Sequence, residues 1–215
     1  MNQAACFSEL NKSKQQGYEV VKLGHPALRN PSAKIPSEMF HSRELDRFVE
    51  NMRYTLEKEG GVGLAAPQVG VNLELLVTRV SEGAAGRYLL CEKSDFKVWI
   101  NPRIAIVDSA QLLGAEGCLS VPGYVGLVAR PKEIQVHAVD ENGQGFSERL
   151  SGWNARVFLH EQDHLKGIMY MDKLEGGSGV LVGFFHQEIW KTMEEERRKA
   201  NDYSWLEKHS LKCEQ

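Results

Sequence analysis

Residues 160–167 read HEQDHLKG, and they contain the pattern HExxH, made by His160, Glu161 and His164. On a helix this spacing puts the two imidazoles one turn apart on the same face, with a carboxylate beside them. Such an arrangement usually binds a catalytic metal. Because two histidines make only half of a tetrahedral site, at least one further ligand has to come from another part of the chain.

The residues around the motif have the pattern of a helix over 152–166. Ser151 stands at its N-cap position, Lys166 lies in its last turn, and Gly167 is placed to end it. We therefore expect the HExxH motif to lie on a complete helix with recognisable ends.

Apolar side chains lead up to the two histidines on one side of this helix. A stripe with the spacing i, i+4, i+7 and i+11 holds Trp153, Val157, His160 and His164, and Glu161 lies next to it. Such a stripe makes a dry pocket beside a metal. A core helix with two incidental histidines has the same stripe, so the pattern alone leaves both interpretations open.

The third ligand separates the classes of HExxH protein. Metzincins continue as HExxHxxGxxH, but Tyr170 stands where their third histidine would be. Gluzincins use a glutamate of a later helix; here that would be Glu188, in an amphipathic stretch where a solvated side chain is commoner. Cys118, in the glycine-flanked stretch GAEGCLSVPG, can supply a thiolate and leave one position open for water. A free cysteine is usually a small buried apolar residue, but beside HExxH the ligand interpretation is favoured.

Composition limits the classes of partner. The chain has 215 residues and a formal net charge of −3, which suits one globular domain, or one domain with a tail. No basic surplus indicates nucleic acid or an anionic membrane, and no apolar run approaches the roughly 20 residues that span a bilayer. The N-terminus lacks the apolar segment of a secretory signal. Four cysteines without a CxxC pair are typical of reduced thiols in a cytosol-like compartment.

The order of predicted elements indicates an α+β fold. Residues 43–58 carry apolar side chains on one helical face, and the glycines that follow end this first helix. Strand-like runs cover residues 73–80, 86–91, 97–108 and 133–140. The Asn-Gly pair in DENGQ, residues 140–144, predicts a hairpin. We expect mixed or antiparallel β-sheets packed around the central HExxH-bearing helix, with a C-terminal helix at about 179–200.

Three motifs together resemble one family. GVGLAAPQ at 61–68, EGCLS at 116–120 and HEQDHLKG at 160–167 are similar, in order and spacing, to the signature motifs of peptide deformylases. SGWNAR at 151–156 resembles the branch that includes mitochondrial, plastid and some bacterial members. The resemblance implies a metal-dependent hydrolase that removes the formyl group from N-formylmethionyl peptides and releases formate.

The resemblance also assigns roles to single residues. Cys118, His160 and His164 would bind one divalent metal, natively Fe(II) and often Zn(II), Ni(II) or Co(II) in preparations. Glu161 would be the general base and acid. The oxyanion hole would consist of the Gln68 side chain and the backbone N–H of Leu119.

Peptide binding is implied at two places. Val62, Gly63 and Gly117 would hold the peptide backbone as an added strand. Trp153 and Val157 share the ligand face and would wall the methionine pocket, although ordinary core packing explains them equally well.

Four other positions carry side chains of interest. Glu116 and Arg130 either pair to brace the cysteine loop or form a pair at the surface. Asp163 either orients a ligand histidine or caps the helix surface. Val125 stands about where many bacterial members of the family carry an arginine near the peptide path, so contacts beyond the methionine can differ.

The resemblance runs from about residue 23 to residue 176. We expect a catalytic domain over residues 1–176 and a C-terminal helical extension over residues 177–215. The expected partners are N-formylmethionyl nascent peptides, with transient ribosome contact through the extension, and neither nucleic acid nor membrane. The expected location is cytoplasmic as in bacteria, or, as the alternative, an organelle after removal of a transit peptide.

Two other functions remain open. An HExxH endopeptidase of another clan would need a third ligand other than Cys118. A member that only binds metal or peptide would be expected to have lost Glu161, Gln68 or Cys118, and all three are present.

Overall fold

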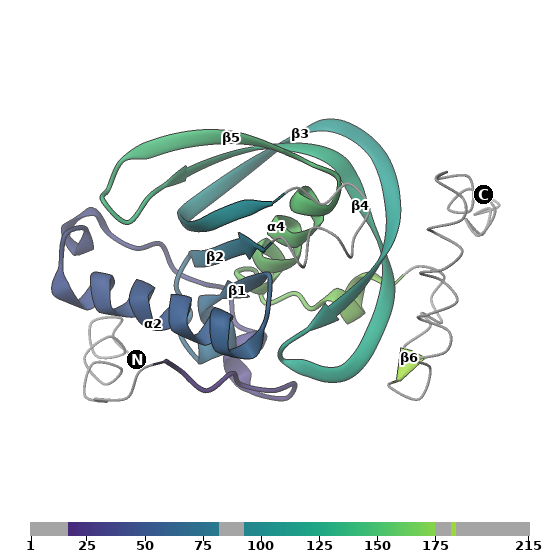
Figure 1. Cartoon of the computed structure of the whole chain (residues 1–215), viewed down its shortest axis with the longest axis horizontal. Coiled ribbons are helices and arrows are strands. Elements are labelled where there is room, and N and C mark those ends of the chain that lie inside the picture. The colour runs from purple at the N-terminus through teal and green to yellow at the C-terminus, as the bar shows by residue number, and fades with distance from the viewer. Residues whose placement is uncertain (1–16, 82–92, 175–181, 184–215) are drawn as a thin grey trace.

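The computed structural model describes residues 17–81, 93–174 and 182–183. Its main elements are α2 (Arg43–Glu59), β1 (Gly63–Ala65), β2 (Leu75–Val80), β3 (Ser94–Cys118), β4 (Val121–Val139), β5 (Gly145–Ser151), α4 (Gly152–His164) and β6 (Val182–Gly183). Short 3-10 helices cover Pro26–Leu28, Ser37–Met39, Ala66–Val69 and Tyr170–Lys173. The sheet curves around α4, while α2 lies at its other side (Figure 1). The predicted α+β class with a central HExxH helix is confirmed.

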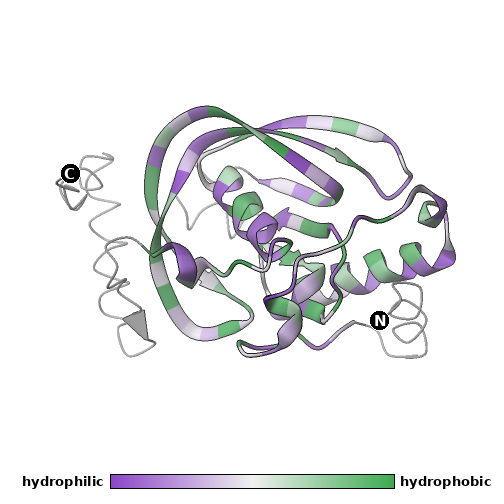
Figure 2. Cartoon of the chain, turned by 180° about the vertical axis from the view of Figure 1, so that it is seen from behind, coloured by the Kyte–Doolittle hydropathy of each residue, from purple (hydrophilic) through white to green (hydrophobic). Residues whose placement is uncertain are grey.

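Helix α2 forms because its sequence provides both an apolar face and two caps. The buried face includes Leu45, Phe48, Val49, Met52 and Leu56, and apolar and polar residues alternate along α2 in Figure 2. The hydroxyl of Ser42 accepts the N–H of Leu45 at 3.2 Å. Gly60 ends the helix with a φ of 65°, a left-handed conformation that costs glycine little. The predicted helix over 43–58 is confirmed.

The sheet has the strand order β1-β2-β3-β4-β5, and every pairing along this order is antiparallel. β1 and β5 are the two ends of that order, while β6 pairs with β4. The predicted hairpin joins β4 to β5. In its turn, the carboxylate of Asp140 accepts the N–H groups of Asn142 and Gln144 at 2.9 and 2.8 Å.

Strand β2 separates two parts of the core. Leu75 and Val77 pack into the cluster that includes the apolar face of α2. Leu76, which points to the other face of the strand, packs with Phe158 and Trp99 in the cluster under α4. The two faces of β2 therefore hold α2 and α4 on opposite sides of the sheet.

Helix α4 is buried almost throughout, with every residue from Ala155 to His164 inside the protein. It ends at His164, two residues before the predicted end. Gly167 has a φ of 72°, and the N–H groups of Gly167 and Ile168 close the last turn on the carbonyls of His164 and Asp163. The Ser151 side chain occupies the N-cap position without capping the helix.

Two sequence-based expectations differ from the structure or lie beyond it. Val182–Gly183 forms a strand against Tyr124 and Val125 of β4, so the predicted helix over 179–200 is wrong at these residues, because backbone pairing with β4 replaces helical hydrogen bonds there. The rest of that helix and the strand predicted at 86–91 fall outside the described residues. Within the described residues, no helix is long and apolar enough to cross a bilayer.

Candidate metal centre

Two stripes of side chains face each other across the interface between α4 and the β3–β4 hairpin. In a strand, alternate residues share a face, which places Gly114, Glu116 and Cys118 of β3 on one face about 6.6 Å apart. On α4, residues four apart are separated by about 6 Å along the axis, which aligns Arg156, His160 and His164. Because these spacings nearly match, consecutive residues of one stripe can meet consecutive residues of the other.

These two facing stripes form a ladder of contacts between β3 and α4, and three potential metal ligands meet at one end of it. One ligand atom each from Cys118, His160 and His164 lies within 4.8 Å of the others, and Cys118 Sγ is 3.4 Å from His164 Nε2. One sulfur and two imidazole nitrogens suit a tetrahedral divalent ion and leave its fourth position open. Burial lowers the pKa of His164 well below its ordinary value, which keeps the imidazole neutral, the form that binds metal. The residues therefore fit the metal implied by the sequence.

Glu116 fixes the orientation of the first histidine. Its Oε2 lies 2.9 Å from Nδ1 of His160, which places the proton on Nδ1 and leaves Nε2 free as a ligand. Burial raises the pKa of Glu116, but hydrogen bonds from Arg130 and His160 outweigh this effect and hold it well below the usual range. Glu116 is therefore an ionised carboxylate that accepts a hydrogen bond from the Nδ1–H group of His160.

Arg130 connects Glu116 to α4. It donates to Oε1 and Oε2 of Glu116 at 2.9 and 2.8 Å, and also to Asp163. The second oxygen of Asp163 accepts from Lys173 at 2.8 Å. The Glu116–Arg130 pair is buried, so it braces the cysteine strand and is not a surface pair. The hydrogen bonds of Asp163 go to Arg130 and Lys173 and not to a ligand histidine. Asp163 is also buried, so it fixes the position of Arg130 and does not cap the helix surface.

Sequence reasoning missed Arg156 as part of this network. Its guanidinium donates to Glu116 Oε1 at 2.8 Å and to the carbonyls of Val128 at 2.7 Å and Gly114 at 3.3 Å, as well as to that of Leu112. The signal was its position, one helical turn before His160 on the ligand side, where a charged residue needs a buried partner.

Tyr170, which stands where metzincins carry their third histidine, also contacts the centre. Its ring stacks against His160 with centroids 5.9 Å apart, and its hydroxyl donates to the carbonyl of Tyr124 at 3.1 Å. Tyr170 thus packs against one ligand instead of acting as another.

Glu161 lies beside the ligands in a space that glycine creates. A Cβ atom added at Gly63 of β1 would stand 2.5 Å from Glu161 Oε1, so only glycine leaves room for this carboxylate. Burial raises the pKa of Glu161 to about 7, with His160 opposing and Glu116 reinforcing the rise. A carboxyl with such a pKa can accept and return a proton near neutral pH.

Gln68 and Leu119 also reach this site. Gln68 Oε1 accepts the N–H of Ala65 at 2.8 Å, and its Nε2 approaches Cys118 Sγ at 3.4 Å and Ser120 Oγ at 3.5 Å. The Gln68 side chain is buried and fixed, with its donor group facing the ligand sulfur. Leu119 follows Cys118 directly, and its carbonyl accepts from Lys22 Nζ at 3.1 Å.

Two of the residues predicted to hold the peptide backbone, Gly63 and Gly117, lie on strands. Gly63 belongs to β1, at an end of the strand order, directly after Val62. Gly117 of β3 is paired with Val125 of β4, which locates Val125 beside the cysteine loop. An end strand such as β1 has backbone groups that an added strand can use.

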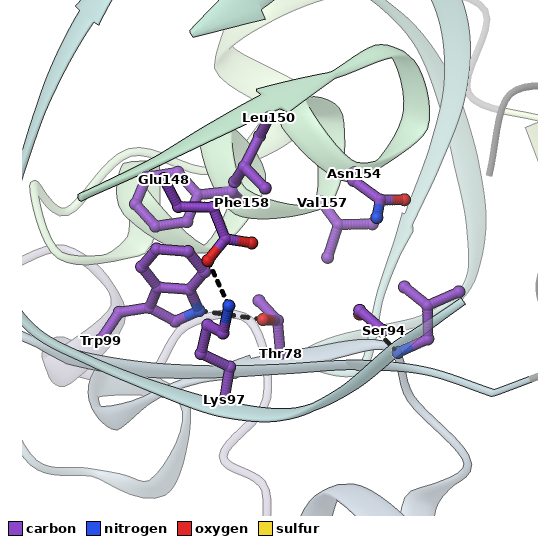
Figure 3. Close-up of a pocket in the computed structure, with 10 residues that line it drawn as sticks. Thr78, Ser94, Lys97, Trp99, Glu148, Leu150, Asn154, Val157 and Phe158 are labelled. Atoms are coloured by element: carbon purple, nitrogen blue, oxygen red, sulfur yellow. Dashed lines mark hydrogen bonds and ion pairs between the residues drawn. The ribbon is translucent and has the colours of Figure 1, made fainter. Parts of the chain in front are cut away.

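Figure 3 shows a pocket between α4 and strands β2, β3 and β5. Val157 lines it together with Thr78, Trp99 and Asn154. Thr78 pairs with Gly63 in the sheet, and Gly63 is the glycine that leaves room for Glu161. On α4, Val157 lies one turn before Glu161. The pocket therefore lies close to the metal centre. Trp153 is not among the residues that line it.

Comparisons with known proteins agree with this geometry. The polypeptide deformylase family profile matches residues 18–178. The chloroplastic peptide deformylase 1A of Solanum lycopersicum is 36% identical over 80% of this chain and 65% of its own length. Peptide deformylase 3 of Streptomyces avermitilis is 40% identical over 73% of this chain and 70% of its own.

A solved structure has the same fold. The class I type b peptide deformylase of Acinetobacter baumannii bound to Met-Ala-Ser superposes with a TM-score of 0.68 at 29% identity, covering 74% of this chain and 98% of that one. The resemblance seen in the three motifs thus extends over the whole region that surrounds the metal centre.

Proposed function

The chain belongs to the polypeptide deformylase family, and from this premise we propose that it removes the formyl group from the N-terminal formylmethionine of newly made proteins. It is a peptide deformylase, a hydrolase that uses water to release formate. One observation carries the proposal: the Cys118, His160 and His164 cluster lies beside a buried carboxylate, Glu161, whose Oε2 has no hydrogen-bond partner among the described residues.

Cys118, His160 and His164 would hold a divalent metal, which would supply Lewis acidity and would lower the pKa of a bound water molecule. Glu161 removes a proton from the attacking water as its oxygen bonds to the formyl carbon. The C–N bond then breaks, and Glu161 passes the proton to the departing nitrogen. The immediate products are formic acid, which keeps the second proton of the water, and a free α-amino group. Formic acid then ionises to formate and releases that proton to the amine or to solvent, so atoms and protons balance.

Charge develops on the formyl oxygen during this step. The Gln68 amide group, held through its own oxygen by the N–H of Ala65, and the backbone N–H of Leu119 would donate to it. Donors that are fixed before the reaction stabilise such an oxyanion without reorganising.

Backbone pairing would align the peptide with these groups. Val62 and Gly63 at the end strand β1, with Gly117 across the site, offer groups for an added strand. The methionine side chain would extend to the pocket that Val157 lines, and Trp153 would contribute only to its approach. The Acinetobacter baumannii relative with Met-Ala-Ser bound supports a peptide of this kind as the ligand.

The metal identity, the location and further partners are part of the same proposal. Fe(II) is the proposed native ion, and Zn(II), Ni(II) or Co(II) can replace it, since thiolate and imidazole ligands accept all four. A reduced thiol at Cys118 needs a cytosol-like compartment, which is either bacterial cytoplasm or an organelle. We propose ribosome contact through the predicted extension 177–215. Of this extension, only Val182–Gly183 belongs to the described residues.

Formate release from formyl-Met-Ala-Ser tests the proposal, with the full chain purified anaerobically and loaded with Fe(II). We expect turnover by the unmodified chain and a loss of about 10²–10⁴-fold in Glu161→Ala, with the metal content unchanged. Absence of formate from fully metallated protein would reject the function. Activity that survives in Glu161→Ala would reject the assigned base.

A further inference from the structure

Four charged side chains are buried together behind the ligands. Glu116 and Asp163 are the acids, and Arg130 and Arg156 are the bases; each is no more than 5% exposed. Within this buried group Arg130 and Arg156 balance the charges of Glu116 and Asp163, and the partly exposed Lys173 also pairs with Asp163. Uncompensated charge is costly in this environment. Arg156 lies at the opposite end of the ladder from His164 and touches no metal ligand in the bonds described above.

We propose that Arg156 is a positioning residue of the metal centre that acts on His160 through Glu116. The inference deepens the proposed function, on which it rests for the metal centre, and it does not depend on the identity of the substrate.

The bonding of Glu116 shows how this control operates. Oε1 accepts from Arg156 and Arg130, while Oε2 accepts from Arg130 and faces Nδ1 of His160. Arg156 is also tied to carbonyls of both β3 and β4, so it cannot follow the carboxylate if that group rotates. The guanidinium therefore holds Oε1 in place and thereby presents Oε2 to the imidazole.

Gly114 shows that the position of the guanidinium is built into the fold. A Cβ atom at Gly114 would stand 2.8 Å from Cζ and 2.9 Å from Nε of Arg156. The backbone of Gly114 lies in a regular strand, and the three atoms nearest to an added Cβ all belong to the guanidinium of Arg156, so alanine at this position would displace that group. The missing side chain provides the surface on which the guanidinium rests.

The experiment measures the affinity of the full chain for Co(II). The protein competes with a chelator for Co(II) during a titration, and the absorption band of the Cys118 thiolate bound to Co(II) reports how much metal the protein holds. We expect Arg156→Met to weaken binding about 10–100-fold, as is typical when a group behind the ligands is removed. Arg156→Lys, which keeps the charge but cannot contact Glu116 and two strands together, should lose less.

Gly114→Ala provides a second variant in case Arg156→Met does not fold. It leaves every charged group in the chain and displaces only the guanidinium, so it should weaken Co(II) binding in the same direction. Arg149→Met is the matched control, because Arg149 pairs with Glu133 in an exposed position on β5. It should bind Co(II) like the unmodified chain.

A double-mutant cycle separates positioning from general support of the fold. If Arg156 acts through Glu116, Arg156→Met combined with Glu116→Gln should lose no more Co(II) affinity than Glu116→Gln alone. Losses that multiply, or wild-type affinity in both Arg156→Met and Gly114→Ala, would overturn the proposal. Co(II) binding is measured without substrate, so this failure is distinguishable from an absence of formate release in the unmodified chain.

Discussion

Helices α2 and α4 are stabilised in opposite ways. α2 buries one apolar face against β2 and leaves its charged residues in water. α4 is surrounded by the sheet and buries charged and polar groups from Arg156 to His164. A one-sided helix needs only an apolar stripe, whereas a helix buried on all sides needs a specific partner for each polar group. Substitutions in the two helices should therefore have different consequences.

The largest effect is expected where one partner of the buried network is removed. Arg130→Met leaves Glu116 and Asp163 without their shared guanidinium, and we expect a loss of about 3–5 kcal/mol in the free energy of unfolding. Urea denaturation measures it. Lys132→Met on the same strand, which removes an exposed lysine, is the control. A loss for Arg130→Met as small as for Lys132→Met would show that α4 does not depend on paired charge.

A slightly smaller effect is expected in the apolar face of α2. Leu45→Ala removes a fully buried side chain and should cost about 2–5 kcal/mol, while Leu45→Met should cost less than about 1.5 kcal/mol. Because α2 contributes no residue to the metal centre, Co(II) affinity of the folded protein should stay unchanged. A fall in Co(II) affinity in Leu45→Ala would mean that the two helices are coupled.

The helix N-termini provide a matched pair of small changes. The Ser42 hydroxyl caps α2, whereas the Ser151 side chain makes no capping bond to α4. Ser42→Ala should cost about 1 kcal/mol, and Ser151→Ala less than about 0.5 kcal/mol. Thermal melts of both variants measure the difference. Equal losses would contradict the assignment of the caps.

The smallest effect concerns an exposed ion pair after α4. Burial raises the pKa of Asp172, but Arg29 and the N–H of Met169 outweigh it and lower the pKa below its ordinary value. The stabilisation is therefore fully present above the unfolded-state pKa and disappears as pH falls through the lower folded-state value. Solvent screening limits it to roughly 0.5 kcal/mol.

Asp172→Asn isolates this contribution. The difference in melting temperature between the unmodified chain and the variant should be present at neutral pH and shrink towards about pH 3, below the ordinary pKa of aspartate. A difference that grows in acid would show that the sign is wrong.

Sequence reasoning was most successful where a local pattern carries the information. The apolar stripe of residues 43–58 predicted α2, and Asn-Gly in residues 140–144 predicted the β4–β5 hairpin. HExxH predicted that His160 and His164 share a face, and the geometry places Cys118 with them. Arg156 was missed because its partners, Glu116 and the carbonyls of β3 and β4, come from at least 28 positions away in the chain.

By itself, the sequence determined the elements with short periods and the chemistry of single residues: an amphipathic helix, a hairpin, and two imidazoles one turn apart. Only the tertiary structure decided which residues of β3 face which residues of α4. That alignment depends on strand register and on the depth at which the helix is buried, and neither is a local property of the chain. It turns Glu116 and Arg156 from ordinary charged residues into supports of His160, since a buried charge is stable only beside the partner that the fold brings to it.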